Sequence, residues 1–424
     1  MNTDADAIAD CVLGAFDGLP EKRKPRARND SLREWVPLAG IVLSKDGKLS
    51  CVSLGTGMKC LPSNKLPLAH GNVLHDWHAE VLAIRTFNRF LVNECMLLSK
   101  PPYPPSEWVR ARRNEELAEH EQQPYTIQED VQIHMYCSEA PCGDASMELV
   151  MDAQDDATPW TSVPPTVATH SSDAIENNDM SIPSSLPSAL RGRANFSHLG
   201  AVRCKPSRSD APPTLSKSCT DKLALKQATS LLSSITSTLI SPRNAYMHSL
   251  ILPSSQYVPT ACERAFTRTG RLTSLSDDTI ASWKGGYTWS PFAIQPTTRE
   301  FTWSRRAVLP TQKAVASNLS AIWTPSWQET LIGGVLQGRK QFDPRGASAI
   351  CRRSLWKTAV QIAGVVGFPL LAERLGKRKY EDVKADEMFE VRKKVKHDVK
   401  HAGLQGWVKN AGDSEFCLNE LKES

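Results

Sequence analysis

The distribution of apolar residues along the chain predicts a mixed α/β protein. Residues 1–20 carry apolar side chains at helical spacing and predict a short amphipathic helix (Ile8, Val12, Leu13 and Phe16). The segments 35–43 and 49–54 predict two strands joined at the turn Lys45-Asp46-Gly47. Residues 131–136 alternate between apolar and polar side chains and predict a third strand.

A longer helix is predicted from Val81 to Leu98, where apolar residues again recur at helical spacing. Asp76 occupies the position expected for a helix N-cap, so we expect His78 and Glu80 in the first turn. Zinc deaminases need this combination: the imidazole binds Zn²⁺, and a carboxylate that is not a ligand moves protons. An isolated H-x-E is common in a chain of this length, however, so the motif alone does not establish a site.

The motif Pro141-Cys142-Gly143 strengthens this prediction, because it follows the third predicted strand. The amide dipoles at the start of a helix stabilise a thiolate ligand at such a position. The deaminase signature P-C-x-x-C is incomplete here, since residue 145 is Ala, and a third ligand must come from elsewhere. Cys219, at the head of another predicted helix, is the preferred candidate. Cys137 is the alternative, although a cysteine in a strand is more often a small core residue.

Composition indicates an ordinary soluble protein with a mild positive charge. The 424 residues include 51 Lys and Arg against 46 Asp and Glu, for a net charge of +5. This length accommodates one elaborated domain or two, and no internal repeat is present. The basic residues are clustered, which suits a polyanionic partner, although each cluster alone is also compatible with a solvated face (22–28, 191–208, 339–353 and 377–400).

The cysteines and the hydropathy of the chain predict where in the cell the protein is located. The eleven cysteines follow no regular framework, and the N-terminus shows no basic-then-apolar leader. We therefore expect reduced thiols and an intracellular location, in the cytoplasm, the nucleus or both. The longest apolar run, 359–372, is too short to span a bilayer and contains Pro369, so no membrane contact is expected.

Three further segments are expected to be loops or insertions. Gly55-Thr56-Gly57-Met58-Lys59-Cys60 ends the second strand, and its glycines would let the backbone approach a substrate while Lys59 meets a phosphate. A tight turn without a ligand is the simpler interpretation of this local sequence. Residues 100–130 begin with four prolines around Tyr103 and predict an exposed insertion. Residues 151–194, rich in Ser, Pro, Thr and Asp, predict a disordered insertion.

Three motifs, taken in order, give the chain a resemblance to a known family. They are His78-Ala79-Glu80, Pro141-Cys142-Gly143-Asp144-Ala145-Ser146 and Ser218-Cys219-Thr220-Asp221-Lys222. Together they resemble the eukaryotic adenosine-to-inosine RNA deaminases, over about residues 35–407 without the two insertions. The stretches 210–216 and 225–227 are most similar to the fungal tRNA-specific branch. Only about thirty residues precede the first strand, so no double-stranded-RNA-binding module is expected there, which favours a tRNA enzyme.

The resemblance implies that His78, Cys142 and Cys219 hold one Zn²⁺ and that Glu80 is the proton shuttle. The implied reaction is hydrolytic deamination of adenosine to inosine in tRNA, at the adenosine 3′ of the anticodon (A37) of tRNA-Ala. Residues expected near the substrate are Lys59, Lys205 and Asp210. Other classes remain open: editing of double-stranded or other RNA, deamination of cytidine, and an inactive RNA-binding homologue. No obligate protein partner is expected beside tRNA.

The implied fold is a three-layer, cytidine-deaminase-like α/β fold with a central mixed sheet, formed by residues 1–424 as a single deaminase domain. Its C-terminal half would close around a buried inositol hexakisphosphate, whose six phosphates need many cationic donors. The residues expected around this ligand are Arg85, Lys222, Arg352, Tyr380, Lys384, Arg392, Trp407 and Lys409. Without the resemblance, the predicted helix 384–400 would be a solvated basic face; with it, Lys393, Lys396 and Lys400 are expected to point outward.

Overall fold

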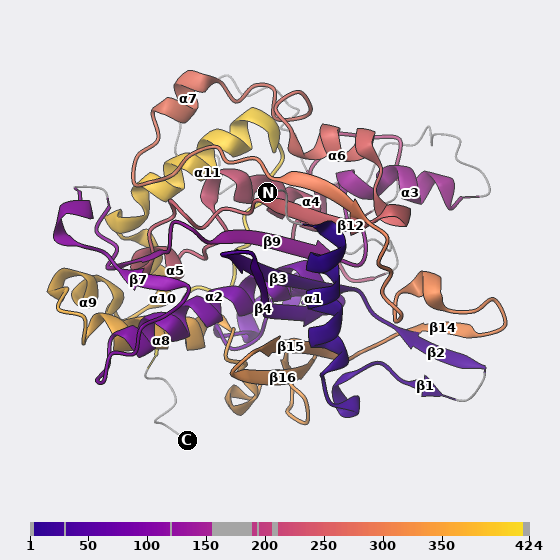
Figure 1. The fold of residues 1–424 in the computed structure, drawn as a ribbon, viewed down its shortest axis with the longest axis horizontal. Helices are drawn as coiled ribbons and strands as arrows, with labels where there is room; N and C mark the ends of the chain where they lie inside the picture. Colours follow the sequence, from indigo (N-terminus) through magenta and orange to yellow (C-terminus); the bar gives the residue numbers. More distant parts are fainter. Residues whose placement is uncertain are drawn as a thin grey trace.

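The structure, a computed structural model, describes residues 4–28, 31–118, 121–154, 189–192, 195–205 and 211–418. At its centre lies an eight-stranded sheet with the order β13-β12-β9-β3-β4-β15-β16-β17 (Figure 1). Strands β9, β12 and β13 run parallel, whereas the remaining neighbours pair antiparallel. The predicted mixed sheet is therefore confirmed. Its strands are β3 (Leu38–Lys45), β4 (Lys48–Thr56), β9 (Gln132–Cys137), β12 (Ser249–Pro253), β13 (Ala293–Thr297), β15 (Ser320–Thr324), β16 (Trp327–Ile332) and β17 (Val335–Leu336).

Helices cover both faces of this sheet, because successive side chains of a strand point to opposite sides. Helix α1 (Ala5–Asp17) packs on one face: a Cβ added at Gly40 of β3 would lie 2.5 Å from Val12 of this helix. Helix α2 (Ala79–Leu98) packs on the other: a Cβ at Gly55 of β4 would lie 2.5 Å from Leu82. The two glycines thus permit close approach of a helix on each face.

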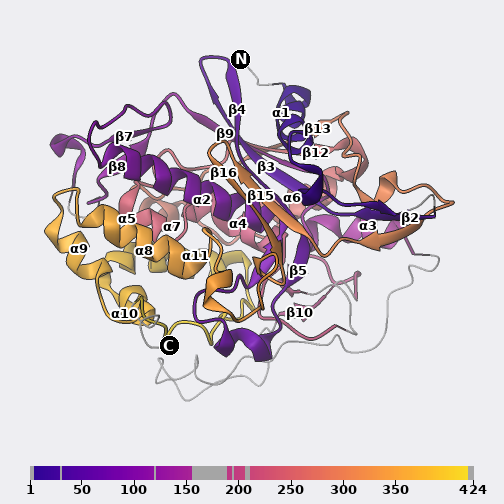
Figure 2. The same cartoon turned by 90° about the horizontal axis from the view of Figure 1, so that it is seen from below.

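The C-terminal helices gather on the α2 side of the sheet, away from α1 (Figure 2). The helix predicted over 384–400 is divided at Asp386, whose carboxylate accepts a hydrogen bond from the backbone N–H of Met388 and starts a new turn there. The remaining helices are α3 (Met147–Asp152), α4 (Cys219–Thr229), α5 (Thr236–Leu239), α6 (Pro259–Phe266), α7 (Asp277–Ala281), α8 (Arg352–Ala363), α9 (Pro369–Leu375), α10 (Tyr380–Ala385) and α11 (Glu390–Gly403).

A second, three-stranded sheet lies beside the central one at the right of Figure 1. It contains β1 (Ala27–Arg28), β2 (Leu32–Trp35) and β14 (Lys313–Ala316), in the order β1-β2-β14. The predicted strand 35–43 is therefore two strands in different sheets. They are separated at Pro37, which has no backbone N–H for a continuous ladder.

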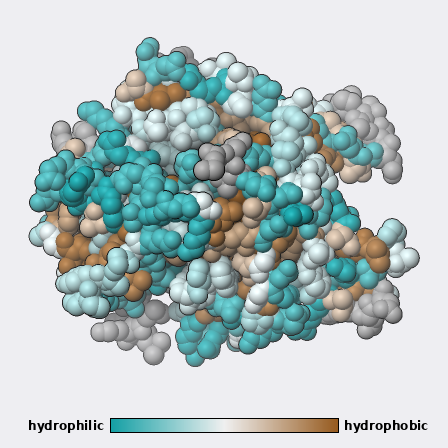
Figure 3. All heavy atoms as spheres, in the orientation of Figure 1, coloured by the Kyte–Doolittle hydropathy of each residue, from teal (hydrophilic) through white to brown (hydrophobic). Residues whose placement is uncertain are grey.

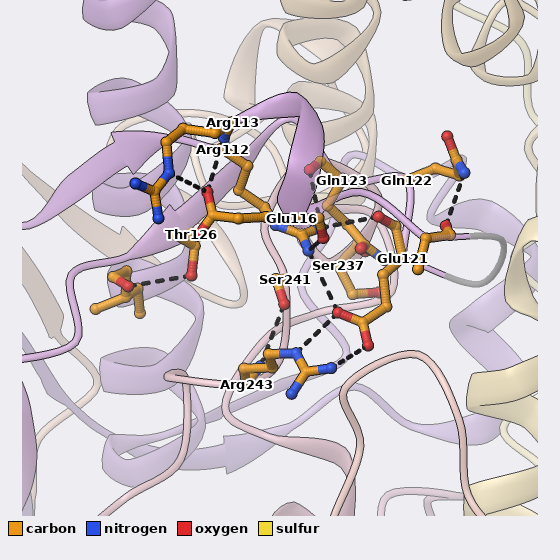
Figure 4. A network of polar contacts seen from close by, with 12 residues as sticks. Arg112, Arg113, Glu116, Glu121, Gln122, Gln123, Thr126, Ser237, Ser241 and Arg243 are labelled. Atoms are coloured by element: carbon orange, nitrogen blue, oxygen red, sulfur yellow. Dashed lines mark hydrogen bonds and ion pairs between the residues drawn. The ribbon is translucent and has the colours of Figure 1, made fainter.

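The segment 100–130, predicted as an exposed insertion, is only partly exposed. Its start is exposed, but its later part forms the hairpin β7 (Val109–Ala111) and β8 (Tyr125–Ile127), whose Val109 and Ile127 belong to the main core. Glu121 then joins this hairpin to the rest of the chain by accepting a 2.8 Å hydrogen bond from Nε of Arg243 (Figure 4). Of the other predicted insertion, 151–194, residues 155–188 lie outside the described part of the chain.

The surface of the described residues is mostly hydrophilic on the face shown in Figure 3, with apolar residues gathered over α9, where Leu370 is exposed. Among the described helices, none combines the length and apolarity needed to cross a bilayer.

Candidate active site

Three segments distant in sequence bring His78, Cys142 and Cys219 together. His78 is the residue before α2, Cys142 follows β9, and Cys219 is the first residue of α4. The Cys142 thiol lies within hydrogen-bonding reach of both the Cys219 thiol and the His78 imidazole. The backbone N–H of Cys219 also donates to Sγ of Cys142 at 3.4 Å. The sequence prediction that these three side chains share one place agrees with this geometry.

Gly143 allows the two cysteine segments to meet. Its φ of 116° favours glycine, and an added Cβ would lie 2.3 Å from Oγ of Ser218, the N-cap of α4. Any larger residue would push the start of α4 away from Cys142. The cap itself is ordinary, since Oγ of Ser218 accepts a hydrogen bond from the backbone N–H of Asp221 at 3.1 Å.

The start of α2 differs in one respect from the prediction. Asp76 is not the helix cap: it lies in the short strand β6 (Asp76–His78), and His78 occupies the N-cap position. The carboxylate of Asp76 accepts a 3.0 Å hydrogen bond from the backbone N–H of His78 and is otherwise occupied by side chains from the region of α4. Glu80 lies in the first turn of α2, as predicted.

Glu80 is buried next to the cysteine and histidine side chains, 7% exposed. Burial raises its pKa above the ordinary value, and the negative charge of Cys142 raises it further. A carboxyl group with a raised pKa takes up a proton more readily than an ordinary glutamate and can release it to a nearby acceptor. The side chain is therefore suited to general acid and base chemistry.

The two thiols are electrostatically distinct. The hydrogen bond with Cys219 and the positive charge of Lys205 hold the pKa of Cys142 well below its ordinary value. Burial and the neighbouring Cys142 raise the pKa of Cys219. Cys142 thus contacts one imidazole and a second thiol, and one of the two thiols favours the thiolate. One imidazole and two thiols are a donor set of the kind that zinc prefers.

A buried ion-pair network supports this donor set. Nζ of Lys205 lies 2.8 Å from Oδ2 of Asp76 and 3.2 Å from Sγ of Cys219. Oγ of Ser216 donates to the same carboxylate oxygen at 2.6 Å, and Lys222 also pairs with it. Burial opposes the charge of Asp76, but Lys205 and Lys222 hold its pKa well below the ordinary range. The network thus links the cysteine segment to the start of α2.

A second group of possible metal ligands shares His78. Nδ1 of His78 lies 3.8 Å from Sγ of Cys60 and 3.2 Å from Oδ1 of Asp76, and the three donor atoms lie within 4.8 Å of one another. Sequence reasoning did not single out Cys60 as a ligand. The pairing of β5 (Met58–Cys60) with β6 places it opposite Asp76. Asp76 already pairs with Lys205 and Lys222. A metal held by His78, Cys142 and Cys219 would leave these ion pairs intact, whereas a metal held by Cys60, Asp76 and His78 would take the Asp76 carboxylate from them.

The alternative ligand Cys137 lies in β9, 1% exposed, and burial raises the pKa of its thiol well above the ordinary value. That environment is typical of a core cysteine.

Among the residues expected near the substrate, Lys59 is exposed on β5. Lys205 is 3% exposed and is bonded to Asp76 and Cys219. Asp210 lies outside the described residues.

A cluster of cations fills the space between α4, α8, α10 and α11. Burial and neighbouring Arg392 lower the pKa of Lys384 to about 7. The same two causes hold the pKa values of Lys226 and Lys396 well below the ordinary range. Nε of Arg392 is buried and has no hydrogen-bond partner in the described chain. We refer to Lys226, Arg352, Lys384, Arg392 and Lys396 as the cation cluster.

The expected ligands of an inositol phosphate are distributed unevenly around this cluster. Arg85 and Tyr380 lie close enough to Arg352 for its charge to shift their pKa values. Trp407 lies under Lys400, whose Nζ is 5.2 Å from the ring centroid. Lys222, in contrast, pairs with Asp76, and Lys409 is exposed.

Two cluster members differ from the sequence prediction. Lys396 was expected to point outward but lies among the other cations, and Lys226 was not proposed. The four-residue spacing of Arg392, Lys396 and Lys400, and of Lys222 and Lys226, could have indicated both, because such residues share one face of a helix. Lys393 is exposed, as expected.

A partly buried imidazole and two thiols beside a free carboxyl, on helices against a mixed sheet, define the class of hydrolases that deaminate nucleobases. Comparison with known proteins specifies the class further. The model of the adenosine-deaminase (editase) domain matches residues 53–411, so the chain belongs to this family of adenosine deaminases.

Named relatives agree with this assignment. The chain is 34% identical to the tRNA-specific adenosine deaminase 1 of Schizosaccharomyces pombe, over 84% of this chain and 85% of that protein. It is 32% identical to the protein of the same name from Saccharomyces cerevisiae, over 59% of this chain and 58% of that protein. The double-stranded RNA-specific editase B2 of Mus musculus is 29% identical, over 51% of this chain and 27% of that protein.

Proposed function

We propose that this chain is a zinc-dependent enzyme that hydrolyses adenosine to inosine in tRNA and releases ammonia. The observation that carries the proposal is the contact of Cys142 with both His78 and Cys219, directly beside buried Glu80. We further propose that the target is the adenosine 3′ of the anticodon, A37, of tRNA-Ala. The long match to a fungal protein named for tRNA supports tRNA as the substrate class.

In this mechanism His78, Cys142 and Cys219 would hold the metal, and Nζ of Lys205, 3.2 Å from Sγ of Cys219, would stabilise that sulfur as a thiolate ligand. A bound Zn²⁺ supplies the Lewis acidity that makes water nucleophilic near neutral pH. Glu80 accepts the proton of the water and delivers it to N1 of adenine. As the hydroxyl adds to C6, Glu80 takes the remaining hydroxyl proton and donates it to the amino group. The C6–N bond then breaks and C6=O forms, so adenosine and water yield inosine and ammonia. The raised pKa of Glu80 favours this alternation between the two protonation states.

The target base must leave its stack to reach the buried carboxyl. Extrusion costs little when the base is already in a single-stranded loop, which favours an anticodon loop over a duplex. The partial match to an enzyme named for double-stranded RNA keeps editing of duplex RNA as the second candidate.

We also propose that the cation cluster binds inositol hexakisphosphate. One buried cation, Arg392, and four partly buried cations at one place repel one another and are costly to desolvate unless an anion compensates them. The depressed pKa values of Lys226, Lys384 and Lys396 express this cost, and the unpartnered Nε of Arg392 is a donor available to a phosphate. By this proposal, residues 1–424 form one deaminase domain whose C-terminal half encloses the ligand.

The test is incubation of the purified chain with tRNA, followed by sequencing in which inosine is read as guanosine. We expect conversion at one loop adenosine, with about one zinc per chain. Matched tRNA carrying cytidine at that position, and duplex RNA, are the comparison substrates. Conversion of cytidine or of duplex adenosines in preference to tRNA adenosine would contradict the proposal. Bound zinc without any inosine would indicate an inactive RNA-binding homologue.

A further inference from the structure

A cavity of about 380 Å³ lies between the small sheet β1-β2-β14 and the segment that follows β14. Five of its lining residues are apolar: Leu32, Val315, Ala316, Leu319 and Ile332. The other five are polar: Arg26, Glu34, Ser317, Asn318 and Gln337. We call this the β2–β14 pocket.

The pocket adjoins the candidate active site through Lys59. Nζ of Lys59 donates a hydrogen bond to Oδ1 of Asn318 in the pocket wall. Lys59 is followed by Cys60, whose Sγ lies 3.8 Å from Nδ1 of His78. The two segments also pack tightly, because a Cβ added at Gly57 would lie 2.4 Å from Oγ of Ser320. The pocket wall is therefore joined to β5, the strand that pairs with the segment carrying His78.

Some polar groups at the pocket are bonded within the chain, and others are available to a ligand. Glu34 is fixed, since its Oε2 accepts hydrogen bonds from Oγ of Ser317 at 3.0 Å and from the backbone N–H of Arg26 at 3.2 Å. The guanidinium of Arg26 and the side-chain amide of Gln337 have no partner among the described residues, and the amide nitrogen of Asn318 has none either. These groups offer hydrogen-bond donors, and Gln337 also an acceptor, around an apolar floor.

We infer that the β2–β14 pocket binds an unpaired nucleobase next to the target adenosine in the RNA strand, an inference that rests on the proposed function. A nucleobase has two flat apolar faces and an edge of donors and acceptors. Apolar side chains such as Ile332 and Leu319 can cover its faces while amides and a guanidinium bind its edge. The cavity volume is large enough for a purine or a pyrimidine and too small for a base pair with its backbone.

A neighbouring cavity of about 760 Å³ favours a nucleic-acid strand as the ligand. It shares Arg26 with the β2–β14 pocket and is lined by Lys22 and the aromatic ring of Trp303. Glu21 also lines this cavity, and the guanidinium of Arg33 lies over the Trp303 ring, 4.9 Å from its centroid. Lys22 and Arg26 therefore supply the attraction for phosphates here, as basic grooves do in proteins that bind single strands. The strand would thus continue from the pocket across the small sheet.

The test uses tRNA substrates in which each nucleotide flanking the target adenosine is replaced, one at a time, by an abasic nucleotide. With the unsubstituted chain, removal of one particular base should lower kcat/KM for inosine formation about 10- to 100-fold, the range expected for loss of one bound base. In the Ile332→Asp and Arg26→Ala variants, the intact substrate should be slowed by a similar factor. Removal of that base should then cause no further loss.

Lys313→Ala is the matched control, because Lys313 is exposed on β14 but does not line the pocket. It should affect intact and abasic substrates equally and in a salt-dependent way. Thermal unfolding checks that the exposed substitutions leave the fold intact. Indifference of the unsubstituted chain to every flanking base overturns the inference, and so does an equal effect of Ile332→Asp on intact and abasic RNA. Absence of inosine with any RNA instead contradicts the proposed function, and the pocket inference falls with it.

Discussion

Nζ of Lys205 donates a 2.8 Å hydrogen bond to Oδ2 of Asp76, although the two residues are 129 positions apart and at most 5% exposed. The pair joins the segment before α4, which carries Cys219, to the strand before α2, which carries His78. Burial opposes both charges, but each partner favours the ionised form of the other. Lys205 is therefore a positioning residue: it holds two ligand segments in register.

Replacing this lysine should destabilise the fold. In Lys205→Met, buried Asp76 loses one of its two lysine partners and keeps Lys222 and His78. Loss of one partner of a buried ion pair typically costs about 3–5 kcal/mol. Denaturant unfolding measures the change. The control is Lys59→Met, an exposed substitution for which we expect a change within about 0.5 kcal/mol. Equal stability of the two variants would refute a structural role for the Lys205–Asp76 pair.

Glu80→Gln should abolish deamination while leaving the fold and the metal in place. The amide has nearly the shape of the carboxyl group but cannot carry the proton, and loss of a general acid and base lowers kcat by about 10²–10⁴-fold or more. Activity is measured as inosine formed from tRNA in single turnover, with zinc content and thermal unfolding as controls. A variant that keeps its activity would remove Glu80 from the mechanism.

Cysteine substitutions distinguish the two candidate ligand sets around His78. If Cys142 and Cys219 hold the metal, Cys219→Ser should lose zinc, whereas Cys137→Ser and Cys60→Ser should retain it. Metal analysis of the purified variants is the measurement, and the unsubstituted chain gives the reference of about one zinc. Loss of zinc in Cys60→Ser with retention in Cys219→Ser would assign the ion to the Cys60, Asp76 and His78 group instead.

The cation cluster should make stability depend on pH in a predictable direction. Burial and Arg392 lower the pKa of Lys384 to about 7 in the folded chain, against 10.5 for an ordinary lysine. Between these values the unfolded chain binds more protons than the folded one, so the free energy of unfolding should rise as pH increases from 7 to 10.5. Below pH 7 this contribution is constant. The dependence should be measured on anion-free protein by denaturant unfolding.

Binding of inositol hexakisphosphate should suppress this pH dependence, because the phosphates favour the charged form of Lys384. Lys384→Met should weaken the increase in thermal stability that the ligand causes, while Lys393→Met, exposed on α11, should not. The readout is the shift of the unfolding temperature on adding the ligand. An identical shift in both variants would exclude Lys384 from the binding site.

Local sequence was sufficient for the main elements that carry the site. Apolar spacing correctly predicted α1, α2, β4 and β9, because burial of one face imposes the period of the element on the sequence. The motifs around His78, Cys142 and Cys219 predicted the adenosine-deaminase family, which the match over residues 53–411 confirms. The proposed ligand set needs those residue types whatever their distance in the chain.

Local sequence was insufficient where a side chain's partner is remote. Asp76 has the sequence context of a helix cap, yet two lysines from the region of α4 bind its carboxylate. Lys396 has the composition of a solvated face, but the packing of α11 against α4 turns it toward Lys226. The sequence by itself determined which chemistry the chain can perform, because motifs and periodicity are local. Only the tertiary structure decided which charges are buried together and that a pocket adjoins Lys59, because burial and ion pairing depend on contacts between distant segments.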